Sequence, residues 1–365
     1  MRVLMTGGGT AGHVNPAIAI ADTIKKYEPD ATIAFVSSNL RNDKARDLVP
    51  RAGYKLYGVD ICGRYQLWNP KNIKTLALMI KSRRQARKII REFQPDVIIG
   101  TGGFACYPLL SAGADMGIPT LAHESNAIVG KAIKRLSGKL DCIMTNFDAT
   151  KDAITGARRV VRVGNPSVFV PKDKSEVTLG GNFARRVMAV GGSGGAEAFN
   201  DGVAEVIKNI ASKYPDTEFY HAAGKRDFER MSNIFASSGL SALPNVKLVD
   251  YIYDMADRMA ASDVIISRAG AMTISELSLS GKAAILVPSP NVAENHQFKN
   301  AKPIADAKAC LLVEEKQFSS GALCEAVEKL LSDKALRDTL GNNFRKFAEP
   351  DANKKIYDEI KRLVK

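Results

Sequence analysis

The sequence has few cysteines and no cysteine pattern that would organise a small fold. Its five cysteines are scattered along 365 residues, and no two of them form a Cys-x-x-Cys pair. This spacing argues against a disulfide framework and a structural zinc site, and it suits a reducing cytosol. No uncharged apolar run approaches about 18 residues, so we expect no membrane-spanning helix. The first residues lead directly into glycines, which leaves no apolar core for a signal peptide.

Several signatures of cofactor and metal chemistry are also absent. Gly-Lys-Ser/Thr follows neither of the two glycine-rich stretches, which excludes a P-loop. No Asp-x-Asp occurs, which argues against the metal–diphosphate chemistry of many sugar transferases. His221 and His296 belong to no His-x-x-x-His or Cys/His cluster, so the sequence offers no ligand set for a catalytic zinc ion. We therefore expect no metal and no cofactor.

What the sequence does have is a large and unevenly distributed positive charge. Its formal net charge is +13, and its 45% hydrophobic and 25% charged residues are typical of a globular protein. Residues 1–164 hold 25 Lys and Arg against 13 Asp and Glu, whereas the remaining residues hold 27 against 26. The first half is therefore expected to meet an anionic partner, which is nucleic acid, a membrane surface or a phosphorylated substrate.

Short apolar runs alternate with amphipathic segments along the whole chain. The predicted strands are residues 2–6, 32–37, 97–100, 120–123, 142–145, 187–190, 264–267 and 284–288. Helical periodicity is clearest over residues 16–26, 81–93 and 198–213. The alternation predicts an α/β fold, in which helices cover both faces of parallel sheets.

Two stretches follow one plan of strand, glycine loop and helix. They are residues 3–12 (VLMTGGGTAG) and residues 186–196 (RVMAVGGSGGA). We interpret them as the starts of two doubly wound, Rossmann-like domains, 1–164 and 165–345, followed by a terminal segment, 346–365. Ligands of such sheets bind beyond the carboxyl ends of the strands, so two facing domains would share one interdomain cleft.

The first glycine loop and the histidine after it are the first candidate site. Gly7, Gly9 and Gly12 form Gly-x-Gly-x-x-Gly, which lets a backbone approach a phosphate but also suits a tight turn. A dinucleotide site needs an acidic residue after the second strand, where residues 37–39 read Ser-Ser-Asn, and this argues against NAD. A helix N-terminus disfavours imidazolium, so His13 is a candidate general base; a capping or packing histidine is the alternative.

Three further polar clusters follow predicted strands. Residues 123–126 (HESN) need either a ligand or a hydrogen-bond network, and the sequence leaves both open. In residues 267–276 (SRAGAMTISE), Arg268 suits phosphate and Glu276 suits a ribose diol. A capping box of Thr273 and Glu276 is the structural alternative. Residues 288–297 (PSPNVAENHQ) form a polar loop suited to sugar hydroxyls.

The segment from Lys71 to Arg91 carries eight positive residues and no acidic one. On a helix its apolar residues divide between two faces, one with Ile73, Leu76, Ala77 and Ile80, the other with Leu78, Met79, Ala86, Ile89, Ile90 and Phe93. We expect the second face to pack on the sheet. The first would remain an exposed apolar patch rimmed by Lys81 and Arg84 and preceded by Trp68. Such a patch suits anionic lipid, at about 1 kcal/mol per basic residue. Nucleic acid would leave the apolar face unused, and an internal helix contact is the remaining alternative.

Taken together, the motifs resemble those of the MurG family in order and spacing. The matching segments are residues 7–17 (GGGTAGHVNPA), 123–126 (HESN), 164–166 (GNP), 191–196 (GGSGGA), 251–255 (YIYDM) and 268–276 (RAGAMTISE). Members of that family are GT-B enzymes that add N-acetylglucosamine to lipid I to make lipid II. The resemblance implies an inverting, metal-independent transfer from UDP-N-acetylglucosamine to the muramyl C4 hydroxyl of undecaprenyl-pyrophosphoryl-muramyl-pentapeptide. It also implies a peripheral protein on the cytoplasmic face of the bacterial membrane, with no nucleic-acid partner.

The resemblance also implies roles for individual residues. His13 and Glu276 are the catalytic candidates, with His13 as the base and Glu276 on the ribose diol. Contacts with the donor substrate fall to Thr10, Ala11 and Gly12 at the sugar–diphosphate junction, Asn126 and Gln297 on the sugar, Ser193 and Arg268 on the diphosphate, Ile252 on uracil through its backbone, and Ala271, Met272, Thr273, Ile274, Ser275 and Glu276 around the phosphates and ribose. The family's C-terminal helix returns to the first domain, which predicts the same for residues 351–365.

The chain departs from the family pattern at four positions. Ala11 replaces the third glycine of the family's GGTGGH loop, and Val168 stands where the family has an arginine. Phe104 and Cys106 change a loop that is expected near the acceptor. The alternatives are a GT-B transferase with another lipid acceptor such as diacylglycerol, a UDP-sugar epimerase of the same fold, and a UDP-sugar or lipid-binding protein without turnover.

Overall fold

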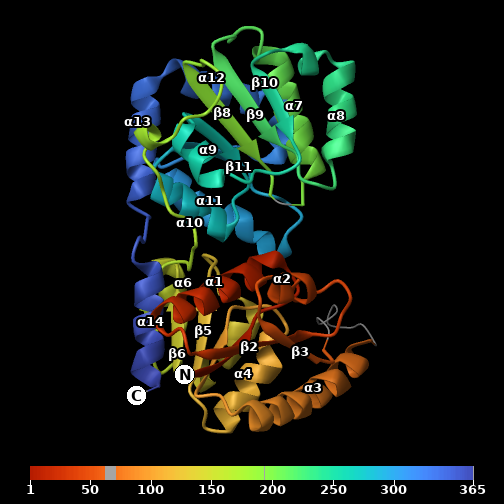
Figure 1. Ribbon diagram of the computed structural model, residues 1–365, viewed down its shortest axis with the longest axis vertical. Coiled ribbons are helices and arrows are strands. Elements are labelled where there is room, and N and C mark those ends of the chain that lie inside the picture. The colour runs from red at the N-terminus through yellow and green to blue at the C-terminus, as the bar shows by residue number, and fades with distance from the viewer. Residues whose placement is uncertain (62–70, 193, 365) are drawn as a thin grey trace. The chain divides into compact units, whose positions relative to one another are not determined.

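The computed structural model describes residues 1–61, 71–192 and 194–364, with the backbone alone described at residues 71–76 and 320. Trp68 and Ser193, and the side chains of Ile73 and Leu76, therefore lie outside the described residues. The chain divides into two compact units, Met1–Val168 with Glu349–Lys365, and Phe169–Ala348 (Figure 1). Among the described residues, no helix has both the length and the apolar character needed to cross a membrane.

The first unit is built on a sheet of seven described strands, all parallel, in the order β3-β2-β1-β4-β5-β6-β7. The strands are β1 (Arg2–Thr6), β2 (Thr32–Ser38), β3 (Lys55–Val59), β4 (Val97–Gly100), β5 (Thr120–Glu124), β6 (Cys142–Thr145) and β7 (Val160–Arg162). The helices are α1 (Ala11–Tyr27), α2 (Ala45–Arg51), α3 (Lys71–Phe93), α4 (Cys106–Asp115), α5 (Lys131–Leu136), α6 (Asp148–Asp152) and α14 (Ala352–Leu363). A short 3-10 turn, η1 (Ser137–Lys139), follows α5.

Alternate residues of each central strand enter two different cores, one on each face of this sheet. In β1, Val3 and Met5 pack with α1, α2 and α14, whereas Leu4 packs with α3, α4 and α5. Because both faces are covered, polar residues are excluded from both sides of the strand. This explains why the run is continuously apolar rather than alternating.

Helix α14, the last helix of the chain, belongs to the first unit. Its Tyr357 ring stacks on Tyr27 of α1 with 4.5 Å between centroids, and Tyr357 Oη donates a 3.0 Å hydrogen bond to Glu28. Glu359 accepts two 2.7 Å hydrogen bonds from the Arg159 guanidinium, beside β7. Ile356 is fully buried in the core beneath α1. The unit therefore includes residues from both ends of the chain.

The second unit repeats the plan with six described strands, all parallel, in the order β10-β9-β8-β11-β12-β13. The strands are β8 (Arg185–Val190), β9 (Thr217–Ala222), β10 (Val246–Val249), β11 (Val264–Ser267), β12 (Ala283–Leu286) and β13 (Leu311–Leu312). The helices are α7 (Glu197–Ile210), α8 (Phe228–Ser237), α9 (Met255–Ala261), α10 (Ala271–Ser280), α11 (His296–Asp306), α12 (Ala322–Ser332) and α13 (Lys334–Arg345). The 3-10 turns are η2 (Lys174–Glu176), η3 (Leu240–Ala242), η4 (Ala293–Asn295) and η5 (Glu315–Ser320).

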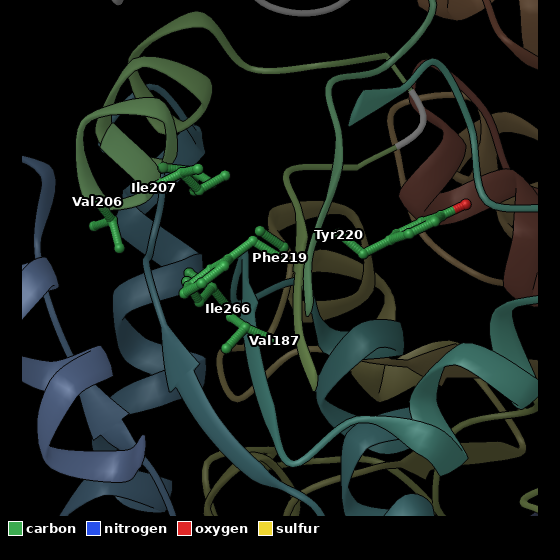
Figure 2. Close-up of a pocket in the computed structure, with 8 residues that line it drawn as sticks. Val187, Val206, Ile207, Phe219, Tyr220 and Ile266 are labelled. Carbon is green, nitrogen blue, oxygen red and sulfur yellow. The ribbon is translucent and has the colours of Figure 1, made fainter. Parts of the chain in front are cut away.

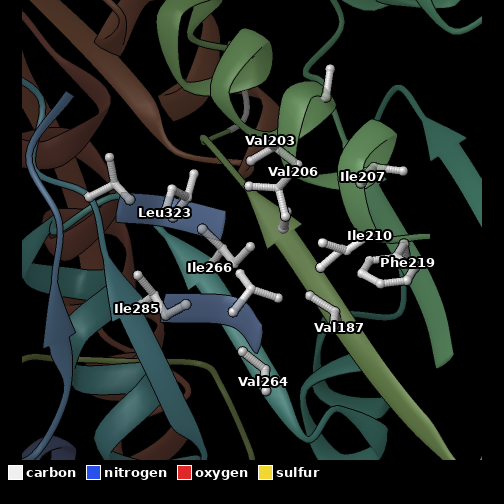
Figure 3. Close-up of a cluster of buried hydrophobic side chains, with 14 of the residues drawn as sticks. Val187, Val203, Val206, Ile207, Ile210, Phe219, Val264, Ile266, Ile285 and Leu323 are labelled. Carbon is white, nitrogen blue, oxygen red and sulfur yellow. The ribbon is translucent and has the colours of Figure 1, made fainter. Parts of the chain in front are cut away.

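The main core of the second unit lies between its sheet and the helices α7, α8 and α12. Val203, Val206 and Ile207 of α7 face Val187 and other strand residues across this layer (Figure 3). An apolar cavity of about 10 Å³ lies beneath α7 (Figure 2). That volume is about the minimum for one water molecule, so the cavity is a packing defect rather than a ligand site.

The two sheets reverse their strand order at equivalent places, and this positions the candidate sites. In the first unit β1 is flanked by β2 and β4, and in the second β8 is flanked by β9 and β11. Ligands of doubly wound sheets bind beyond the carboxyl ends of the strands at such a switch point. Both glycine loops begin there, after β1 and after β8. The predicted doubly wound α/β fold is confirmed for both units.

Candidate functional site

The loop between β1 and α1 packs against the loops that follow β2 and β4. A Cβ on Gly7 would overlap the Thr101 hydroxyl, and one on Gly8 would overlap the Ser37 hydroxyl. Gly9 has φ +86°, in the left-handed region that favours glycine. The protein's own packing therefore requires these three glycines, which favours the tight-turn interpretation of the motif over close approach of a phosphate.

Thr10, Ala11 and Gly12 form the open end of the same loop. Thr10 is the N-cap residue of α1, with extended backbone and no side-chain cap bond. Thr10 and Gly12 are exposed, and a Cβ on Gly12 would meet only the Thr10 hydroxyl, at 3.7 Å. This end of the loop therefore tolerates alanine at position 11 and leaves room for a ligand at the α1 N-terminus.

A buried carboxylate holds the closed end of the loop. Asp43 is 3% exposed and accepts hydrogen bonds from the backbone N–H groups of Gly9 (3.0 Å), Ser38 (3.2 Å) and Ala45 (2.9 Å), and from Ser37 Oγ (2.9 Å). The expected dinucleotide acid at residues 37–39 is absent, but an acid four residues later turns inward to the loop. Asp43 therefore organises the loop rather than binding a ribose.

His13 lies in the first turn of α1, and its ring is held by the loop after β4. His13 Nδ1 lies 3.2 Å from the carbonyl oxygen of Thr101, and Thr101 Oγ1 donates a 2.6 Å hydrogen bond to the His13 carbonyl. Because a carbonyl only accepts, this contact assigns the ring proton to Nδ1 and the basic lone pair to Nε2. His13 is half-buried, so it combines a defined tautomer with access to a substrate.

The HESN cluster after β5 forms a hydrogen-bond network. His123 is fully buried, its Nε2 lies 2.8 Å from Gly164 O, and burial lowers its pKa to about 4. Burial raises the pKa of Glu124, whose oxygens accept bonds from the N–H of Gly130 (2.7 Å) and from the backbone and side-chain amides of Asn126 (3.1 and 3.2 Å). His123 and Glu124 are therefore structural, and Glu124 fixes the position of Asn126.

The second glycine loop follows β8 and is more open than the first. Gly192 has φ +104°, and a Cβ there would meet no atom within 4 Å. Arg226 donates a 3.0 Å hydrogen bond from Nε to Gly194 O, which brings a cation to the loop. Gly195, with φ +78°, packs against the Ala223 carbonyl. Ser193, the predicted diphosphate ligand, lies outside the described residues.

Arg268, predicted to meet phosphate, is 8% exposed and engaged within the protein. Its guanidinium forms an ion pair with Glu315, donates a 3.2 Å bond to Val287 O and lies 5.1 Å above the Phe199 ring. These contacts satisfy part of its donor capacity and fix the turn after β11. A direct contact between Arg268 and phosphate stays a prediction.

Helix α10 presents its N-terminus without any side-chain cap. Gly270 is the N-cap residue, so the capping box of Thr273 and Glu276 is wrong: Thr273 lies inside the helix rather than at its start. Ala271 and Ile274 are buried and Met272, Thr273 and Ser275 are half-buried. The side chain of Ile274 therefore belongs to the core, and the helix offers a ligand mainly its first N–H groups.

Glu276 carries the most unusual carboxylate of the second unit. Burial raises its pKa to about 7. Within the described part of the chain its carboxylate has no hydrogen-bond or ion-pair partner. A desolvated carboxylate without a partner is costly unless a ligand completes it, and two adjacent hydroxyls would do so.

Ile252 lies in the loop after β10, and Gln297 lies in the first turn of α11, which follows the loop after β12. The Ile252 side chain is 4% exposed, so only its backbone is accessible to a nucleobase such as uracil. Beside it, Tyr251 and Tyr253 form an edge-on pair with centroids 5.0 Å apart. Gln297 Oε1 accepts a 2.8 Å bond from Ser289 N, which shapes the polar loop; a contact between Gln297 and the sugar stays a prediction.

Comparison with known proteins places these features in a family. Residues 3–145 match the glycosyltransferase family 28 N-terminal domain, and residues 186–356 match the family 28 C-terminal domain. The chain belongs to glycosyltransferase family 28. Each matched domain contains one of the two glycine loops.

Relatives match this family 28 chain over its whole length. It is 36% identical to the UDP-N-acetylglucosamine–N-acetylmuramyl-(pentapeptide) pyrophosphoryl-undecaprenol N-acetylglucosamine transferase of Acetivibrio thermocellus, over 100% of this chain and 99% of the relative. The Bacteroides thetaiotaomicron transferase of the same name is also 36% identical, over 100% and 98%. The prediction that the chain is related to the MurG family is confirmed.

Solved structures agree. The crystal structure of Acinetobacter baumannii MurG matches with a TM-score of 0.81 and 25% identity, over 99% of both chains. The UDP-N-acetylglucosamine 2-epimerase of Neisseria meningitidis, bound to UDP-N-acetylglucosamine, matches with a TM-score of 0.66 and 15% identity, over 99% and 100%. The second likeness shows a shared fold only.

Helix α3 in the family 28 N-terminal domain carries the basic segment. Its Ala86, Ile89, Ile90 and Phe93 are buried in the core, as expected of one face, whereas Ile80 is 52% exposed. Lys81 forms a 2.8 Å ion pair with Asp60, which lowers the Asp60 pKa to about 2. Arg84 is exposed. The described end of the predicted patch therefore consists of Ile80 with Lys81 and Arg84.

Three residues that organise these sites were not predicted from the sequence. Asp43 and Thr101 shape the first glycine loop and hold His13, and Glu315 binds Arg268. Thr101 carried a usable signal, because it directly follows a predicted strand at the edge where ligands bind. Asp43 and Glu315 carried none, since the residues of the two sites that they hold, Gly9 and Arg268, lie 34 and 47 residues away in sequence.

Proposed function

We propose that this chain transfers N-acetylglucosamine from UDP-N-acetylglucosamine to the muramyl C4 hydroxyl of lipid I, which forms lipid II for peptidoglycan synthesis. The observation that carries the proposal is the full-length match, at 36% identity, to relatives named for this transfer. The held imidazole of His13 and the desolvated carboxylate of Glu276 support it, because the reaction needs a base and a nucleotide site.

In this mechanism His13 acts on the acceptor. Its Nε2 removes the proton from the C4 hydroxyl while that oxygen attacks the anomeric carbon of N-acetylglucosamine. The new bond from C4 oxygen to the anomeric carbon forms as the bond to the UDP oxygen breaks, so the anomeric configuration inverts. The proton stays on His13 and the electron pair leaves with UDP.

The second unit supplies the donor site and stabilises the leaving group. N–H groups of the glycine loop and of the α10 N-terminus are suited to the diphosphate, since both present donors and a positive dipole end. Glu276 accepts hydrogen bonds from the ribose diol, and the Ile252 backbone binds uracil. Asn126 and Gln297 bind sugar hydroxyls. Arg268 fixes the turn before α10 through Glu315 and Val287 O, and its remaining donor capacity is proposed to meet the diphosphate.

The same proposal assigns roles to the parts of the chain. Residues 1–164 take the acceptor and the membrane, residues 165–345 take the donor, and 346–365 complete the first part. Ile80 and Arg84, with the neighbouring basic residues of α3, attach the protein peripherally to anionic lipid, on the cytoplasmic side where a UDP-sugar is available.

An acceptor assay tests the proposal. Purified protein with UDP-N-acetylglucosamine is given lipid I, diacylglycerol or no acceptor, and UDP release and products are measured. Lipid II formation with lipid I alone supports it. Transfer to diacylglycerol instead supports another GT-B transferase, and acceptor-independent epimerisation supports the epimerase alternative. Binding of UDP-N-acetylglucosamine without turnover in all three arms supports a binding protein. Transfer to diacylglycerol, epimerisation or binding without turnover would each overturn the proposal.

A further inference from the structure

Thr101 holds His13 at two points that no local sequence motif connects. Its carbonyl oxygen lies 3.2 Å from His13 Nδ1, and its hydroxyl donates a 2.6 Å hydrogen bond to the His13 carbonyl. The side chain is 2% exposed, and its own N–H donates a 2.9 Å bond to Thr6 O at the end of β1. One residue thus fixes both the ring and the backbone of His13 relative to the sheet.

The residues after Thr101 close around the imidazole and leave it little freedom. Gly102 and Gly103 have φ +104° and +80°, and a Cβ on Gly102 would lie 2.7 Å from His13 Nδ1. Gly102 is held in turn by Cys106, whose Sγ accepts from Gly102 N at 3.2 Å and donates to Gly102 O at 2.7 Å. Burial raises the pKa of this thiol to about 12, so it stays a neutral donor.

We infer that Thr101 is the positioning residue of the catalytic base: its carbonyl selects the Nδ1–H tautomer of His13 and its hydroxyl fixes the helix turn that carries the ring. The role of His13 as a catalytic base rests on the proposed function, whereas the tautomer of its ring does not. A base needs an orienting partner on the nitrogen that does not react, and this is a carboxylate in many enzymes. Here the partner is a neutral carbonyl, so it orients the ring without adding a negative charge beside the acceptor.

A double-mutant cycle separates positioning from structural support. Thr101→Val keeps the shape and the carbonyl but removes the hydroxyl bond, so we expect kcat to fall about tenfold with the KM for UDP-N-acetylglucosamine unchanged. Thr101→Ser restores the hydroxyl and should rescue most of that loss. In a His13→Ala background, Thr101→Val should cause no further loss, because the residue acts only through His13.

The matched control is Thr120→Val. Thr120 is another fully buried threonine of the first unit, and its hydroxyl bonds Asp141 (3.1 Å) rather than His13. Thr120→Val should lose comparable stability and leave kcat within about twofold of wild type. An equal fall in kcat in this control, or a full tenfold further loss from Thr101→Val in the His13→Ala background, would overturn the inference.

A spectroscopic readout keeps the inference separate from the proposed activity. The chain has four histidines, so the ring nitrogens of His13 can be assigned by 15N NMR through the signal that disappears in His13→Ala. We expect protonated Nδ1 and unprotonated Nε2 in the neutral ring of the wild type, and the same tautomer in Thr101→Val, because that variant keeps the carbonyl and loses only the hydroxyl bond. A wild-type ring protonated on Nε2 would contradict the inference even in an active enzyme. The expected tautomer in a protein that fails the lipid I assay would leave the positioning intact and reject the function.

Discussion

The two glycine loops share a sequence pattern but differ in how closely the rest of the protein packs against them. In the first, Gly7 and Gly8 have no room for a Cβ, because neighbouring loops press against them, and Asp43 binds the turn from inside. In the second, Gly192 opens onto empty space, and the Arg226 guanidinium lies at Gly194. One loop is packed so that it can hold a side chain, His13, in place. The other is open at Gly192, whereas a Cβ on Gly191 or Gly195 would overlap Phe199 or the Ala223 carbonyl.

The difference teaches that a glycine-rich loop after a strand does not by itself indicate a phosphate site. Packing demands and ligand access select the same residue, since both exploit the missing Cβ. The neighbours distinguish them: crowding by protein atoms indicates a structural glycine, and open space beside a cation indicates a binding one. The comparison predicts that changes at the first loop alter turnover and folding, and that changes at the second unit alter donor affinity.

The largest expected effect is on turnover. His13→Ala should lower kcat by roughly 10²-fold or more, because it removes the group that takes the acceptor proton. Binding of UDP-N-acetylglucosamine, measured by calorimetry, should survive, since donor contacts are assigned mainly to the other unit. Turnover close to wild type would remove His13 from the mechanism, and lost donor binding would mean that the His13 side chain itself holds the donor.

The next effect is on folding of the first unit. Asp43→Asn puts an amide donor either against the N–H groups of Gly9 and Ala45 or against Ser38 N–H, so we expect about 2–4 kcal/mol of stability to be lost. The comparison variant is Asp227→Asn near the second loop, where Asp227 accepts from Asn200 and Arg230 and Arg230 keeps a second partner, Asp201. Here about 1–2 kcal/mol is expected. Hydrogen exchange measures the stability of each unit separately. Equal losses of stability in the two variants would show that the two carboxylates stabilise their loops equally.

Much of this architecture is readable from the sequence, for a physical reason. Strands buried on both faces cannot alternate, so β1, β4 and β11 stand out as continuous apolar runs. Strands β3, β7, β10 and β13 were missed, because they lie near or at sheet edges and are only partly buried. Strand β9 is buried but contains Glu218, which pairs with Arg186, and His221, whose Nδ1 contacts Ala189 O, so its run is not continuously apolar.

The sites were readable only in part. A residue such as His13 stands out in the sequence, because it has a reactive side chain and directly follows a glycine loop. The groups that hold them do not, since Thr101 and Asp43 act across 88 and 34 residues of sequence. The engagement of Arg268 by Glu315 is equally hidden. A sequence thus shows which residues are offered to a ligand better than it shows which are already occupied by the protein.

A smaller effect concerns the pH dependence of donor binding. Burial raises the pKa of Glu276 to about 7, so the empty site holds a proton below that pH, and the ribose diol needs the ionised carboxylate. The Kd for UDP-N-acetylglucosamine, whose diphosphate diester does not titrate in this range, should therefore rise about tenfold from pH 8 to pH 6. Glu276→Gln should bind more weakly and show no such slope. A flat wild-type profile would separate Glu276 from the diol.

The smallest effect tests the charge difference between the units. Ile80→Ser with Arg84→Gln removes one exposed apolar side chain and one cation from α3, and should weaken binding to anionic liposomes by about fivefold to tenfold. Val170→Ser with Lys208→Gln makes the same loss in the second unit, where Val170 is 69% exposed, and should leave binding unchanged. Activity on a soluble, short-lipid acceptor should be the same in both variants, since neither touches the proposed catalytic residues. An equal loss of liposome binding in the two variants would mean that net charge, rather than the α3 patch, draws the protein to lipid. A loss of soluble activity in the first variant alone would instead make Ile80 part of the acceptor site.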